Sequence, residues 1–198
     1  ENGVITLNGT LSYYPQNWRM LRFVLGSCVD AGSPSPYTHA VREAEGDFID
    51  PTIGTKFPSF TIGDGWTGSA GKHFVRIIKG AEVDRFTLSA AVGEPLKVDI
   101  DYIAKSVTFE SGTVPSGTAS NTSPYLWQEL EIDLPSGTSF AYLKNATFRI
   151  SNNLFGPHYI TNSRYIGEPV PQNRDYEISV TMDADDSWAK DLYCLLYT

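Results

Sequence analysis

The sequence contains few of the residues that commonly build metal sites, disulfides or membrane spans. Its 198 residues include only two cysteines, two methionines and three histidines. Cys28 and Cys194 form no Cys-x-x-Cys pair, and a domain of this size needs no disulfide, so we expect two buried thiols and no zinc. His39, His73 and His158 each lack a second histidine or cysteine at metal-ligand spacing. No apolar run approaches the roughly 18 residues that cross a membrane.

An excess of positive charge is also missing. The formal net charge is −8, from 23 acidic and 15 basic side chains. Proteins that bind DNA or RNA by neutralising phosphates need clustered lysine and arginine, so this function class is excluded. A mildly acidic surface serves mainly to keep a protein soluble, and it also repels nucleic acid.

The short motifs that resemble cofactor-binding or catalytic signatures lack the flanking structure that their chemistry requires. Residues 63–68 (GDGWTG) fit the dinucleotide-binding fingerprint by letter, but that fingerprint lies between a strand and a helix. Here the following residues 72–79 (KHFVRIIK) have strand composition, so we predict a glycine-rich hairpin loop. No Gly-x-Ser-x-Gly elbow or comparable nucleophile context occurs.

Two sets of carboxylates fall on alternating positions. Asp99 and Asp101 form one set, and Glu129, Glu131 and Asp133 form the other. Glycoside hydrolysis would require a pair in a cleft with one raised pKa, and calcium would require more oxygen ligands. We therefore predict no catalytic, cofactor-binding or metal-binding residues, and no enzyme.

The positive signal is strand periodicity. In residues 96–102 (LKVDIDY) every second residue is apolar, which predicts a half-buried strand with an acidic outer face. A Gly-Glu-Pro turn at 93–95 pairs it with 83–91 as a hairpin. The same alternation occurs at 130–134, 146–150 and 176–182, and residues 4–14 also have strand composition. Together these segments predict antiparallel sheets with one buried and one wet face.

The predicted fold is a single, mainly β domain over residues 1–198, an antiparallel β-sandwich or barrel-like structure. Two short helices and two polar loops complete it. One helix covers 17–25, and Ser187 caps another in 185–197 next to the acidic cluster at 183–186. Composition predicts loops at 27–37 and 111–124. Each helix has one apolar face, formed by Trp18, Leu21 and Leu25, and by Trp188, Leu192 and Leu196.

Three stretches carry a further signal. The first is 80–105, with its Gly-Glu-Pro-Leu turn and following strand. The second is 146–197, with an Ile-Ser-Asn-Asn-Leu strand end, a Tyr-Ile-Gly loop, an Asn-Arg-Asp-Tyr strand entry and a closing helix, and the third is the early tryptophan-containing segment at 17–26. In these stretches, about half of the chain, the sequence resembles the tail tube proteins of long-tailed bacterial and archaeal viruses.

The resemblance implies a β-sandwich with a flanking helix, six copies per ring, and rings stacked into a hollow virion tail tube. Its partners would be further copies and other tail proteins, viral DNA would pass through without specific binding, and assembly would occur in the host cytoplasm without a membrane or cofactor. Acidic strand faces suit such a lumen. We expect either Asp99 and Asp101 (with Lys97) or Glu129, Glu131 and Asp133 to line it. Loops 27–37 and 111–124 would be either ring-to-ring contacts or plain connections.

Three other functions fit the same pattern. A different extracellular filament or sheath would predict sugar on the sequons at Asn8, Asn121 and Asn145. A carbohydrate- or ligand-binding β-sandwich would use exposed Trp66 and Trp127 as stacking platforms. A hydrolase would need a cleft that holds two of the carboxylates at a fixed separation.

Overall fold

The computed structural model describes residues 3–31, 38–43, 57–68, 73–110, 114–117, 121–132, 143–160 and 163–183. Eight strands, one α-helix and one 3-10 turn carry the labels used below. Their bounds are β1 Leu7–Tyr13, α1 Leu21–Leu25, β2 Gly26–Ala31, β3 Thr38–Glu43, β4 Phe60–Thr67, β5 His73–Ala91, β6 Lys97–Glu110, η2 Trp127–Glu129, β7 Leu143–Ser151 and β8 Asp175–Met182.

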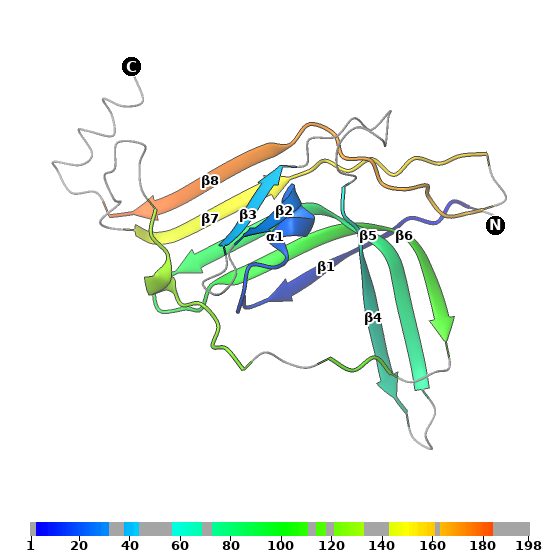
Figure 1. Ribbon diagram of the computed structural model, residues 1–198, viewed down its shortest axis with the longest axis horizontal. Helices are drawn as coiled ribbons and strands as arrows, with labels where there is room; N and C mark the ends of the chain where they lie inside the picture. The colour runs from blue at the N-terminus through cyan, green and yellow to red at the C-terminus, as the bar shows by residue number, and fades with distance from the viewer. Residues whose placement is uncertain are drawn as a thin grey trace.

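The main sheet is antiparallel and has six strands. Its order is β1-β6-β5-β7-β8, and β4 pairs with β5 away from this path. β2 and β3 form a separate two-stranded sheet that lies with α1 across one face of the main sheet (Figure 1). The sheets are not closed into a barrel. The predicted fold class, mainly antiparallel β with a short flanking helix, is confirmed.

Alternation along each strand divides the main sheet into an apolar and a polar face. Four residues on neighbouring strands are successive register partners: Val98 on β6, Leu88 on β5, Phe148 on β7 and Ile178 on β8. Their side chains therefore form one apolar row across the sheet. The predicted hairpin of 83–91 with 96–102 is confirmed as part of the longer β5–β6 pair. The two-residue period of a strand assigns the faces from Arg85 onward, and an irregularity between Val83 and Arg85 interrupts the alternation before it.

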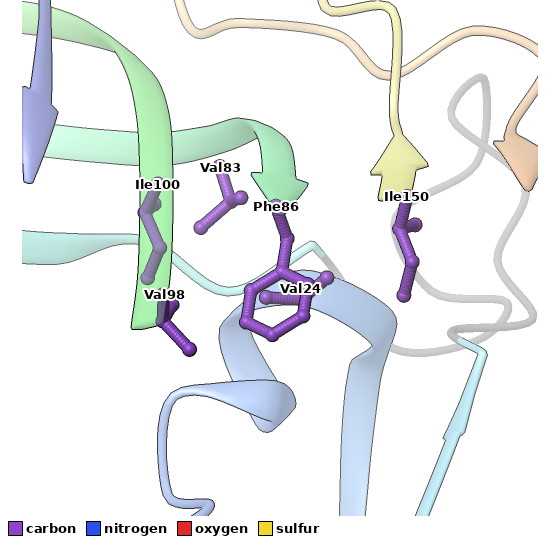
Figure 2. Close-up of a cluster of buried hydrophobic side chains, with 6 residues drawn as sticks. All are labelled: Val24, Val83, Phe86, Val98, Ile100 and Ile150. Atoms are coloured by element: carbon purple, nitrogen blue, oxygen red, sulfur yellow. The ribbon is translucent and has the colours of Figure 1, made fainter. Parts of the chain in front are cut away.

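The core lies on the apolar face, beneath α1. Figure 2 shows one cluster of its buried side chains: Val24 from α1, Val83 and Phe86 from β5, Val98 and Ile100 from β6, and Ile150 from β7. Val24 has no exposed surface, and Phe86 is 1% exposed. Each such side chain contributes about 1.5–3 kcal/mol through burial. The helix ends at Gly26, whose left-handed φ of 106° lets its N–H donate to the carbonyl of Arg22.

Asn152 joins this core to the connection between β7 and β8. It is 1% exposed, and its Nδ2 donates to the carbonyls of Val24 (3.1 Å) and Val83 (2.8 Å). Its Oδ1 accepts from Nε of Arg174 at 2.6 Å. The neighbouring Asn153, at φ 48°, donates to Asp175 at 2.7 Å. The Ile-Ser-Asn-Asn-Leu and Asn-Arg-Asp-Tyr motifs are therefore two halves of one hydrogen-bonded junction.

β4, the N-terminal half of β5 and the C-terminal half of β6 form a three-stranded arm that points away from β7 and β8 (Figure 1). Residues 63–67 lie inside β4, so the predicted glycine-rich loop is wrong. A Cβ at Gly63 would lie 2.9 Å from Cγ of Pro115, and one at Gly65 would lie 2.8 Å from the carbonyl oxygen of Phe74. These glycines are required for close packing, not for phosphate binding.

Three further predictions need correction. Residues 27–31, predicted as loop, belong to β2, because pairing with β3 outweighs their weak strand propensity. Residues 130–132 follow the 3-10 turn and are not a strand. Their alternation arises because Leu130 and Ile132 line an apolar groove. The helix predicted from residue 17 begins at Leu21, after a turn in which Asn17 accepts from the N–H of Arg19.

Other predictions fall partly or wholly outside the described residues. This applies to the helix at 185–197 and to the remainder of the 27–37 loop. Of the 111–124 segment, residues 114–117 and 121–124 are described and have no regular secondary structure.

Candidate assembly surfaces

The polar face of the main sheet carries the first predicted acidic set. The Ser12 hydroxyl donates to Asp99 at 2.5 Å, and Lys97 forms an ion pair with the same carboxylate at 3.1 Å. These contacts, the Ser12 hydrogen bond first, lower the pKa of Asp99 despite the opposing effect of partial burial. The Thr10 hydroxyl donates to Asp101 at 2.6 Å, and Arg85 lies 3.5 Å from it.

Cross-strand pairing extends this surface over five strands. Asp99 is opposite Thr87, which pairs with Arg149, which pairs with Glu177. Arg149 and Glu177 form an ion pair of 2.8 Å. Around Asp99 and Asp101 the ionic side chains of this face are the cations Lys97, Arg85 and Arg149 and the carboxylates Asp99, Asp101, Asp175 and Glu177. This part of the face is therefore hydroxyl-rich and nearly charge-balanced, and its three cations each lie beside a carboxylate. Lys105 is exposed further along the same face of β6.

The second predicted acidic set does not lie on a strand. Glu129 closes the 3-10 turn, where its Oε2 accepts from the N–H of Leu126 at 2.7 Å. Glu131 is exposed between the groove-lining Leu130 and Ile132. Asp133 lies outside the described residues. The structure thus brings Asp99 and Asp101 together on the sheet and places Glu129 and Glu131 on a segment beside the opposite, apolar face.

An apolar groove continues the core face toward β8. It has a volume of about 220 Å³ and is lined by Leu88, Leu130, Ile132, Ala146, Thr147, Phe148 and Ile178. Ile178 is 64% exposed, although its strand pattern predicted burial. The reason is its position, because β8 is the last strand of the sheet. β1 is the last strand at the other end, so among the described residues the sheet ends in two strands that each have one side without a strand partner.

A second apolar surface lies on the arm. Trp66 on β4 packs against Phe74 on β5 with a centroid distance of 4.6 Å, and Phe74 packs against Phe109 on β6 at 5.6 Å. Their exposed fractions are 58%, 38% and 63%. The sequence predicts an exposed ring at Trp66 but not at the two phenylalanines. Strand alternation alone could not reveal them, because it does not distinguish an exposed apolar residue from a buried one.

The remaining candidate residues form no common site. Trp127 is exposed on η2 and Trp66 on the arm, so no shared platform holds both rings. His73 pairs with the hydroxyl of Thr67 at 3.1 Å, and His158 is exposed. In the described ranges, no three metal-ligating side chains cluster. No helix within the same ranges has the length and apolar character to cross a membrane.

Comparison with known proteins agrees with the family resemblance. No curated protein matches the chain. The family model described as phage tail tube protein matches residues 2–193, which is nearly the whole chain. The protein is therefore a structural component of the virion tail that assembles with other tail subunits, and it is not an enzyme. The chain belongs to the family of phage tail tube proteins.

Proposed function

We propose that this protein assembles, in the host cytoplasm, into six-membered rings that stack into a hollow tube, and that viral DNA passes through the lumen. The polar face of β1, β6, β5, β7 and β8 lines that lumen, with Asp99 and Asp101 among its partly exposed groups. The observation that carries this proposal is the chemistry of that face, which is polar across all five strands while the opposite face holds the core.

A DNA-conducting wall must be wetted without retaining phosphates. Free lysine and arginine would bind phosphates and release counterions, which makes passage slow and dependent on salt. On this face the nearest carboxylate lies 3.1 Å from Lys97, 3.5 Å from Arg85 and 2.8 Å from Arg149. Around Asp99 and Asp101 the carboxylates outnumber the three paired cations, so this part of the wall repels DNA weakly, and hydroxyls keep it hydrated.

The two sheet ends supply a means of ring closure. β1 and β8 each leave one row of backbone groups without a strand partner in the described sheet. Pairing of β1 from one copy with β8 from the next would satisfy both rows and continue the sheet around the ring. Such a contact joins two different surfaces, so it repeats from copy to copy and closes after a full rotation.

The arm supplies a contact for stacking. Trp66, Phe74 and Phe109 form a compact aromatic surface on a rigid three-stranded element, which is typical of an interface and unusual for a surface that stays in water. Pro115 lies against Gly63 of β4 and Val114 lies near Gly65, so this part of the chain adjoins the arm. We assign ring-to-ring contact to the arm, including this part of the 111–124 segment.

Negative-stain electron microscopy of concentrated protein, with light scattering alongside, tests the proposal. We expect rings or tubes of regular diameter with a stain-filled channel, and a subunit map in which the polar face points at the axis. Solid filaments would support a sheath or other filament instead. A monomer at all concentrations that binds a glycan would support a binding module. A map that buries the polar face between rings would overturn the lumen assignment.

A further inference from the structure

The main sheet ends in two strands that run in the same direction. Each neighbouring pair in the order β1-β6-β5-β7-β8 is antiparallel. The direction therefore reverses four times between β1 and β8, and the two end strands are parallel to each other. Their lengths are similar, with seven residues in Leu7–Tyr13 and eight in Asp175–Met182. In the described part of the chain, neither has a strand partner on its outer side.

Cross-strand rows carry the two faces of the sheet from one end strand to the other. The apolar row through Val98 begins at Tyr13 on β1 and ends at Ile178 on β8. A row on the polar face begins at Ser12 and ends at Glu177. Ile178 is 64% exposed at the end of its row. A further strand with the same alternation would continue both rows and cover part of this side chain.

We propose that β8 of one copy and β1 of the next form a parallel strand pair, in a register that continues both faces of the sheet. This inference rests on the proposed ring and adds the direction and register of its contact. Copies in a ring are related by rotation about the tube axis. Because the sheet wraps around that axis, rotation preserves the direction of each strand along it. β1 of the next copy therefore runs parallel to β8, and the contact differs from every strand pair within the main sheet of the subunit.

The two faces restrict the register of this contact. Side chains alternate with a period of two, so a shift by one residue would bring Ile178 onto the polar face of the neighbour. Even shifts keep Ile178 on the same face as Leu11 and Tyr13. They also keep Glu177 on the same face as the Ser12 hydroxyl. β1 has no charged side chain, so no like charges meet across the contact.

Disulfide cross-linking between copies measures the direction of the pair. Each variant has one cysteine on β1, from Asn8→Cys, Thr10→Cys or Ser12→Cys, and one on the polar face of β8, in place of Asp175, Glu177, Ser179 or Thr181. Directly opposite residues lie about 5 Å apart, which a disulfide spans, and diagonal ones about 7–8 Å, which it does not. In a parallel pair, the β8 position that links best moves two residues toward the C-terminus for each two-residue step from Asn8 to Ser12. In an antiparallel pair it moves toward the N-terminus.

We expect the linked variants to give a ladder of joined copies on a non-reducing gel. The ladder should be at least tenfold stronger than that of the native chain, whose Cys28 and Cys194 set the background. The control has the β1 cysteine alone, and dimers of this control above background would overturn the proposal, because β1 would then meet another surface. The opposite movement of the best partner, or no ladder in samples with visible tubes, would also overturn it and leave the tube intact. Absence of rings and tubes from the native chain would overturn the proposed function itself, and this inference with it.

Hydrogen exchange of the native protein provides a second measurement, in case the cysteines disturb assembly. Strand pairing between copies gives partners to outward N–H groups on both end strands. We therefore expect amides of β1 and β8 to exchange at least tenfold more slowly in tubes than in unassembled subunits. β6 is the internal control, because it is paired on both sides within the subunit. Unchanged exchange of β1 and β8 in visible tubes would overturn the contact.

Discussion

The side-chain oxygen of Asn152 accepts a 2.6 Å hydrogen bond from Nε of Arg174, and this contact joins the end of β7 to the residue that precedes β8. The same Asn152 side chain donates to carbonyls of α1 and β5, so one buried amide holds three parts of the fold. Arg174 also lies 3.6 Å from Glu43, which connects this junction to β3.

Replacing this amide tests its structural role. Asn152→Ala would remove the amide donor from two carbonyls and the acceptor from Nε of Arg174 in a buried position, so we expect a loss of about 2–4 kcal/mol in the free energy of unfolding. Urea denaturation measures it, and Gln172→Ala, at an exposed neighbouring position, is the control. A loss below about 1 kcal/mol would contradict the assignment.

A methyl group at Gly65 tests the packing of the arm. Gly65→Ala would place a Cβ 2.8 Å from a backbone oxygen, which cannot rotate away, so we expect a loss of about 1–3 kcal/mol. Gly117→Ala is the matched control, because its Cβ would meet no atom within 4 Å. Thermal unfolding should separate the two variants, and equal midpoints would argue against close packing at Gly65.

The aromatic surface of the arm should matter for assembly more than for folding. Trp66→Ser with Phe109→Ser removes two side chains that are mostly exposed in the subunit, so we expect little change in stability. The concentration needed for tube formation should rise at least tenfold, as measured by sedimentation. Val92→Ser changes an exposed apolar residue in the β5–β6 turn and serves as the control. Unchanged assembly of the double variant would exclude the arm from the stacking contact.

Charge reversal on the polar face tests the lumen assignment. Asp99→Lys with Asp101→Lys would leave Lys97 and Arg85 without their carboxylates and add two positive charges. We expect assembled tubes of this variant to retain DNA fragments in a salt-dependent manner, measured by co-sedimentation. Glu94→Lys with Glu110→Lys makes the same change in net charge at exposed sites away from that face. Equal DNA retention by both variants would show that Asp99 and Asp101 do not line the channel.

Acid should weaken the subunit partly through Asp99. Its pKa is lowered in the folded state, so the unfolded chain binds more protons at acid pH. The stabilisation is fully present above the ordinary pKa of 3.8 and is lost as the pH falls through the folded-state value. Asp99→Asn should remove this part of the acid sensitivity below about pH 4, an effect under about 1 kcal/mol because the carboxylate is partly exposed. Chemical denaturation at pH 3 and pH 7 would detect it, and an unchanged difference between the two pH values would contradict it.

Local pattern was sufficient for most of the sheet. The alternation at 96–102, 146–150 and 176–182 placed strands β6, β7 and β8 and assigned their faces, because the two-residue period of a strand is a property of the backbone itself. The same alternation placed Asp99 and Asp101 on the polar face of the sheet. The turn at 93–95 determined the hairpin, since pairing across a short turn needs no distant partner.

Only the tertiary structure decided what those faces meet. The alternation at Leu130 and Ile132 reflects burial in a groove and not strand pairing, and Ile178 is exposed because β8 is the last strand of its sheet. The carboxylates at 99 and 101 have partners on other strands: sheet register places Ser12 of β1 opposite Asp99 and Arg85 of β5 opposite Asp101. Gly63 is required because Pro115 packs against it, and Gly65 because the carbonyl oxygen of Phe74 on β5 lies close to it. Composition and periodicity therefore determined the β class and the two-faced strands, whereas neighbours far apart in sequence determined which surfaces remain available for assembly.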